Sequence, residues 1–181
     1  MAKEWLEVVD TAIKIGLGAL ITGGFTYLGI KKNHQSERSK FIREHKIKIL
    51  EEVSSDLDKY FHSLLRVISI VAGAAKGMDH GLTDVILNKQ QLEDIKTRDK
   101  ELVGSVHLRN SASSKLRLLR ANEAINIINN VVALETELRN RIVFEKKHYN
   151  YKDISAFRSE VYLAKNKFHD ELANIYDNVI Q

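Results

Sequence analysis

The pattern of apolar and polar positions divides the chain shortly after residue 30. Residues 12–30 contain one charged residue, Lys14, whereas the remaining chain mixes apolar and charged positions with a helical period. A helix over residues 13–30 would be about 27 Å long, close to the ~30 Å hydrocarbon core of a bilayer. The pattern therefore predicts an N-terminal membrane anchor over residues 1–31 and a folded helical part over residues 32–181.

The folded part carries apolar residues at helical spacing along most of its length. We expect a long juxtamembrane helix over 32–76 and further helices over 82–104, 113–146 and 151–180. The absence of proline favours long helices, because proline costs about 3 kcal/mol in a helix interior. The expected fold is all-α, with one N-terminal transmembrane helix followed by an antiparallel cytoplasmic bundle of about four helices. The last helix has the clearest period, at Ile154, Phe157, Val161, Ala164, Phe168, Leu172, Ile175 and Val179.

The excess positive charge lies directly after the apolar segment. The chain has a net charge of +4, and residues 51–181 carry equal numbers of acidic and basic residues. A nucleic-acid-binding domain spreads basic residues over its folded surface, so no nucleic-acid partner is expected. We predict instead a collar that binds anionic lipid of the inner leaflet, at about 1 kcal/mol per basic residue. Its residues are Lys31, Lys32, Arg38, Lys40, Arg43, Lys46 and Lys48.

The charge asymmetry also predicts an orientation. The N-terminal flank is short and acidic, so the positive-inside rule places the N-terminus outside and the C-terminus in the cytoplasm of an inner (plasma) membrane. A cleaved signal peptide fits poorly, because the N-terminal flank is not basic and Lys14 interrupts the apolar run. Burial of the segment inside a soluble bundle remains an alternative reading.

Small residues recur along the apolar segment at spacings of four and three positions. Such a stripe lets two membrane helices approach closely, which predicts a homo-oligomer that associates through the membrane. Ordinary small-residue content explains the same spacing equally well. The stripe consists of Ala12, Gly16, Ala19, Gly23 and Thr26.

No pattern typical of a catalytic, cofactor-binding or metal site is present. The seven histidines include no HExxH pair and no pair three or four residues apart, and the chain has no cysteine. Phosphate-binding glycine loops and the GxSxG nucleophile turn are also missing. We therefore expect no enzyme activity, no cofactor and no bound metal.

One arginine–histidine spacing suggests a lesser alternative. Arg141 and His148 are separated by six residues, as are Arg38 and His45. The first pair resembles the motif of HEPN-type ribonucleases, which are all-α, and the resemblance implies that both side chains act at the RNA phosphate and 2′-hydroxyl. Phe144 departs from the stricter form of that motif, which has histidine there, and so loose a spacing arises about once by chance in such a chain.

The expected function is that of a single-pass inner-membrane protein whose bundle mediates protein–protein interaction as a scaffold, adaptor or accessory subunit. The alternative is a membrane-acting effector of the phage-exclusion or toxin type that oligomerises through its transmembrane helix. The sequence does not identify the protein partner.

Overall fold

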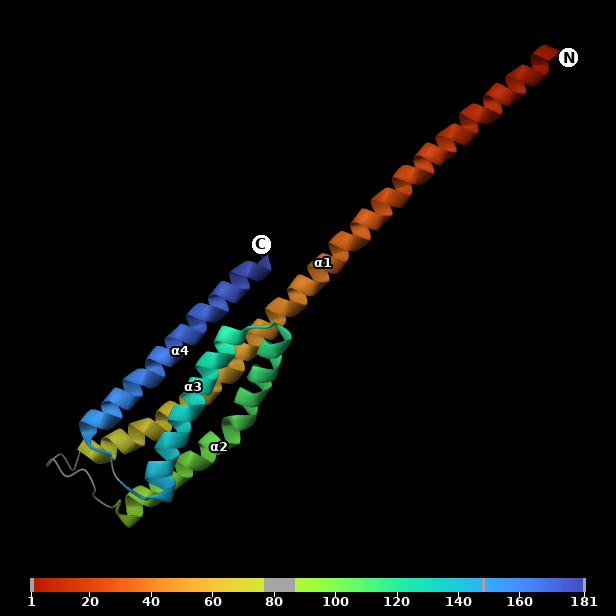
Figure 1. Ribbon diagram of the computed structural model, residues 1–181. Helices are drawn as coiled ribbons and strands as arrows, with labels where there is room; N and C mark the ends of the chain where they lie inside the picture. Colours follow the sequence, from red (N-terminus) through yellow and green to blue (C-terminus); the bar gives the residue numbers. More distant parts are fainter. Residues whose placement is uncertain (1, 77–86, 148, 181) are drawn as a thin grey trace. The chain divides into compact units, whose positions relative to one another are not determined.

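A computed structural model describes the backbone of residues 2–76, 87–147 and 149–180 (Figure 1). Side chains are described for these residues from Thr22 onward, except at Gly29 and Gln35. Over this part the chain forms four α-helices and one π-helical turn, with no strand, which confirms the all-α prediction. The elements are α1 (Ala2–Lys76), α2 (Lys89–Leu118), α3 (Asn122–Arg139), η1 (Asn140–Phe144) and α4 (Tyr151–Ile180).

The chain divides by its internal contacts into Met1–His45 and Lys46–Gln181. The division falls inside the predicted juxtamembrane helix rather than at residue 31. The first unit holds the N-terminal part of α1, and the second holds the remainder of α1 with the other helices. Burial of α1 side chains begins at Leu50 among the described residues, which accounts for the boundary just before it.

Within Lys46–Gln181, successive helices run in alternating directions (Figure 1). Two salt bridges show that α1 and α2 are antiparallel. Asp56 of α1 pairs with Lys115 near the end of α2, whereas Arg66, further along α1, pairs with Glu101, which lies earlier in α2. The prediction of an antiparallel four-helix bundle is therefore confirmed for this unit, in the up-down-up-down arrangement that short connections favour.

The bundle core is lined by apolar side chains at helical spacing. From α1 it takes a row that recurs every three or four residues, as one buried face of a helix requires. The predicted inward positions of α4 are also confirmed, with Phe168 and Val161 fully buried and Ala164, Ile175 and Val179 packed at the margin. The fully buried row on α1 includes Val53, Leu57, Leu64, Val67, Ile68 and Val71.

The two middle helices are divided differently from the prediction. The predicted break between helices 82–104 and 113–146 was wrong. Helix α2 continues through Gly104 and residues 111–114 as far as Leu118. Gly104 has open space around it, and Ala112 is fully buried against the core. Core packing thus outweighs the weak helix propensity of glycine and serine at these positions.

The break between α2 and α3 lies instead at Arg120, which has a positive φ of 57°. The Ala121 N–H donates to Leu116 O and the Arg120 N–H to Arg117 O, each at 3.0 Å. These two bonds form a Schellman motif, whose left-handed position is usually a glycine. Because arginine occupies it here, the sequence gives no glycine signal at the point where the helix ends.

The starts of α2 and α4 are capped by asparagine side chains. Asn88 Oδ1 accepts from the Gln91 N–H at 2.9 Å, and the Gln91 side chain accepts from the Asn88 N–H in return, so α2 begins with a capping box. Asn150 Oδ1 accepts from the Asp153 N–H at 2.7 Å at the start of α4. The predicted helix start at residue 82 lies outside the described residues.

No helix in the part with described side chains holds a stretch long and apolar enough to cross a membrane. Residues 1–21 and residue 29 of the predicted anchor lie outside that part. The predicted transmembrane helix is therefore not supported by the described residues.

Candidate functional site: an acidic groove between α3 and α4

A buried polar cluster joins α1, α2 and α3 and fixes their relative positions. The Tyr60 hydroxyl donates to Glu135 Oε2 at 2.6 Å, and Arg109 Nη1 donates to the same oxygen at 2.7 Å. Glu135 is only 4% exposed, so these bonds compensate for the loss of its hydration. Burial, reinforced by the Glu135 charge, raises the pKa of Tyr60 well above its usual value, which keeps the hydroxyl protonated as a donor.

A second ion pair joins α2 to the end of α3. Arg139 donates from Nε to Asp99 Oδ1 at 2.6 Å and from Nη2 to Asp99 Oδ2 at 3.1 Å. This hydrogen-bonded pairing with Asp99 raises the pKa of Arg139. A bidentate pair of this kind fixes orientation as well as distance, so α3 has a defined position directly before η1.

The position of α4 is set by its contacts with α1. The rings of Phe61 and Phe168 lie with centroids 6.3 Å apart, and Asp58 Oδ1 lies 2.9 Å from Lys165 Nζ and 3.2 Å from His169 Nε2. Burial alone would raise the pKa of Asp58, but hydrogen bonding and charge from Lys165, with a contribution from His169, lower it. Aromatic packing and this half-exposed pair together fix α4 along α1.

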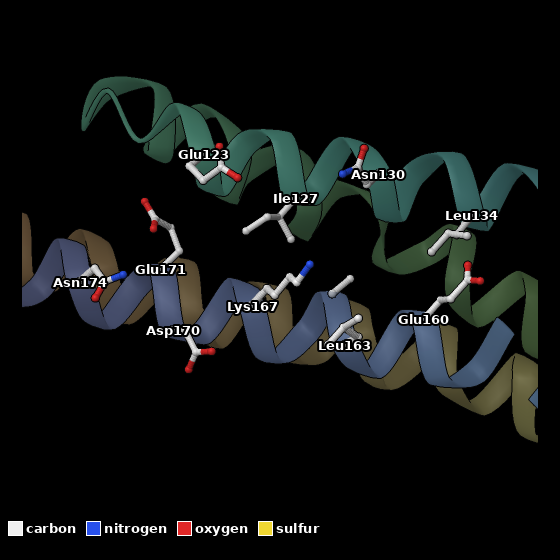
Figure 2. A pocket seen from close by; sticks show the side chains of 11 residues that line it. Glu123, Ile127, Asn130, Leu134, Glu160, Leu163, Lys167, Asp170, Glu171 and Asn174 are labelled. Atoms are coloured by element: carbon white, nitrogen blue, oxygen red, sulfur yellow. The ribbon is translucent and has the colours of Figure 1, made fainter. Parts of the chain in front are cut away.

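A groove of about 510 Å³ lies between α3 and α4, which are held in this way (Figure 2). Its floor is apolar. Ile127 and Leu134 come from α3, and Leu163 and Ala164 come from α4. Leu163 is 56% exposed, although it lies beside other apolar side chains in the groove. The groove thus leaves apolar surface in water.

The edges of the groove are acidic. Its lining includes four carboxylates, from Glu123, Glu160, Asp170 and Glu171, and one ammonium group, from Lys167. Figure 2 shows Glu171 and Lys167 reaching toward α3, whereas Asp170 points away from it. The groove therefore carries an excess of negative charge beside an apolar floor.

These four carboxylates differ from most others in the bundle. None of them forms a salt bridge with a residue whose side chain is described, whereas Glu52, Asp56, Asp58, Asp99, Glu101 and Glu135 are all paired. The paired acids stabilise contacts between helices. Glu51, Asp94, Glu137, Asp153 and Asp177 also lack a salt bridge among the described side chains, but they lie outside the groove. The four groove carboxylates are distinguished by lying beside its apolar floor, where a cationic partner would neutralise them.

Across the described residues, no group of three histidine or acidic side chains could hold a metal ion. The groove carboxylates come from both helices and are distributed along its length. Their arrangement suits an extended partner with several positive charges better than a single compact cation.

The predicted self-association stripe is described only in part. The side chains of Ala12, Gly16 and Ala19 lie outside the described residues. Gly23 has open space around its Cα, and the exposed Thr26 hydroxyl donates to the Thr22 carbonyl of its own helix at 2.8 Å. The two described members of the stripe are thus accessible, and self-association through it stays a prediction.

The predicted lipid-binding collar lies on an exposed stretch of α1. All seven of its basic residues are exposed, and Lys40 lies 3.9 Å from Glu44 of the next turn. Exposed pairs of this type contribute about 0–1 kcal/mol, so the collar remains available to an external anion. Its binding to lipid stays a prediction.

The arginine–histidine pair of the ribonuclease alternative cannot be assembled from described residues, because His148 lies outside them. The Arg141 guanidinium lies over the Tyr149 ring, 4.5 Å from its centroid. Phe144, which replaces the histidine of the stricter motif, is exposed. The described residues therefore do not test the ribonuclease alternative.

The groove could not be predicted from the sequence, because the acidic residues on α4 resemble an ordinary solvated face. A signal was present in Leu163, an apolar residue outside the buried phase of Val161 and Phe168. Models of known protein families, curated proteins and solved structures were all compared with the chain, and none matched.

Proposed function

We propose that this chain is a single-pass membrane protein whose helical bundle binds another protein as a scaffold, adaptor or accessory subunit. The observation that carries the membrane part is the exposure of large apolar side chains on α1. Phe25 is 72% exposed, Tyr27 67% and Leu28 60%. At 100° per residue, Phe25 and Leu28 share one face of the helix. Tyr27 lies on the opposite face together with Ile30, which is 53% exposed. Lipid would cover both faces at once, whereas one protein surface would cover only one side.

The residues that follow support an orientation for this anchor. Lys31 and Lys32 come one turn after Leu28 and are exposed, where their ammonium groups would meet lipid headgroups. Because positive charge collects on the cytoplasmic side of membrane helices, we propose that the N-terminus lies outside an inner membrane and the bundle in the cytoplasm.

The bundle supports the interaction part of the proposal. Buried Glu135 and Asp99 are both paired with arginines of neighbouring helices, and these pairs hold the helices in place. The α3/α4 groove is different, because it combines exposed apolar surface with unpaired charge. That combination is typical of surfaces that bind other proteins.

The anchor is tested by inserting charge into the apolar segment of the full chain. We expect the unchanged protein to stay in the membrane pellet after sodium carbonate extraction. The double variant Leu20→Asp, Gly24→Asp should move to the supernatant, because each central acidic residue costs about 2.5–3.5 kcal/mol of insertion free energy. Gly24 has open space around it, so an added side chain meets no steric obstacle there.

The matched control adds the same two charges elsewhere. Asn126 and Asn129 lie on an exposed face of α3, and the variant Asn126→Asp, Asn129→Asp should stay in the pellet. Release of the unchanged protein by carbonate would contradict the anchor, as would equal retention of the two double variants.

A further inference from the structure

We propose that the α3/α4 groove is the docking site for a basic, amphipathic helix of a partner protein. The inference deepens the interaction role proposed above and rests on it. It names the surface, which is lined by Glu123, Ile127, Leu134, Glu160, Leu163 and Glu171 among others. It also names the chemistry of the occupant, a helix with one apolar face and flanking lysines or arginines.

The shape of the groove fits a helix of about three turns. Its α3 edge extends from Glu123 to Leu134, which is about 17 Å at 1.5 Å per residue. Ile127 and Leu134 lie two turns apart on one face of α3, and Leu163 lies across from them on α4. Apolar residues of a docked helix at positions i, i+3 or i+4, and i+7 would pack on this floor.

The charges of the groove select a basic partner. Glu123 on α3, with Glu160 and Glu171 on α4, places carboxylates on both sides of the apolar floor. Since none of them has a salt-bridge partner among the described side chains, flanking lysines or arginines on the occupant would neutralise them. Lys167 would pair with an acidic residue of the occupant and so favour one orientation.

The same charges disfavour other occupants. Anionic lipid and nucleic acid carry phosphates, which the excess of carboxylates repels. A second copy of this chain would have to offer its own basic segment, residues 38–48. In the proposed function that segment belongs to the collar on the anionic membrane surface. A separate protein is therefore the occupant that this chemistry favours.

The test uses the full chain in nanodiscs of neutral phosphatidylcholine, with empty discs as the blank. The probe is a fluorescein-labelled 15-residue helix of leucine and lysine, with leucines at positions i, i+3, i+4 and i+7. Fluorescence anisotropy should show saturable binding. An otherwise identical peptide with glutamate in place of lysine should bind at least about tenfold more weakly.

Matched variants then locate the binding. Glu160→Lys with Glu171→Lys should weaken binding about tenfold or more, and Leu163→Asp should do the same by polarising the floor. The control Glu51→Lys with Asp94→Lys makes the same change in net charge at exposed acids outside the groove. Its affinity for the peptide should stay within about twofold of the parent's. Circular dichroism of each variant should match that of the parent.

Equal weakening by the groove and control variants would overturn the proposal, because binding would then follow net charge alone. Failure of the lysine helix to bind better than the glutamate helix would also overturn it. If the discs hold dimers that Glu160→Lys with Glu171→Lys converts to monomers, the occupant is a second copy and the partner assignment falls. Carbonate extraction of the groove variants separates this outcome from loss of the anchor, since they should all remain in the pellet.

Discussion

Replacing Glu135 by alanine should destabilise the bundle by about 3–5 kcal/mol, because removing one member of a buried ion pair leaves the other charge without a partner. The side chain of Arg109 is 14% exposed and lies 2.7 Å from Glu135. The variant also removes the acceptor of the Tyr60 hydroxyl. Since domains of this size are stable by about 5–15 kcal/mol, the loss should be visible as a large shift in the midpoint of urea unfolding followed by circular dichroism.

Glu137 provides the matched control, because it lies on the same helix two residues further on and is exposed. Glu137→Ala should change the free energy of unfolding by less than about 0.5 kcal/mol. Equal effects of the two substitutions would mean that the Tyr60–Arg109–Glu135 cluster does not stabilise the fold.

Replacing Phe168 by alanine should cost about 3–5 kcal/mol, the usual loss when a buried aromatic side chain leaves a cavity. Phe168 is fully buried, and its ring packs at a tilt against that of Phe61 across the contact between α4 and α1. Because the groove depends on the position of α4, the variant should also weaken binding of the basic helix. Urea unfolding and fluorescence anisotropy measure the two effects on the same sample.

Phe144 is the control for that substitution. It is exposed, and its ring lies 5.9 Å from the Arg139 guanidinium, a contact of about 0.5–1 kcal/mol. Phe144→Ala should therefore cost about 1 kcal/mol or less and leave peptide binding unchanged. A cost for Phe168→Ala no larger than this would show that α4 is not held by its aromatic contact.

The parts of the fold with strong periodicity could be predicted from the sequence. Phe157, Val161, Phe168 and Leu172 repeat at four or seven residues, and all four are buried as expected. The junction of α2 with α3 could not be predicted, because Arg120 occupies a position where glycine is the usual signal. The predicted helices left residues 105–112 between them, whereas tertiary packing keeps these residues helical within α2.

The candidate site was harder to predict, because it depends on which faces meet. Glu135 shares a helical face with Ile128, Val131 and Leu138. Its position on this apolar face indicates burial from the sequence alone. Its partner Arg109 lies on another helix, so the pairing requires the packing of α2 on α3. The groove likewise combines α3 and α4 residues that no single-helix pattern relates.

The most direct measurement of the membrane anchor is a spin-label scan, which the absence of native cysteine permits. Single cysteines at positions 12–36 of the full chain in liposomes would be labelled, and collision rates with oxygen and with a polar nickel chelate recorded. The account predicts that oxygen collisions dominate from residue 12 to residue 30 on every side of the helix, and that the chelate dominates from Lys31 onward. Strong chelate collisions across residues 12–30, or oxygen dominance along one face only, would contradict a helix that spans the bilayer.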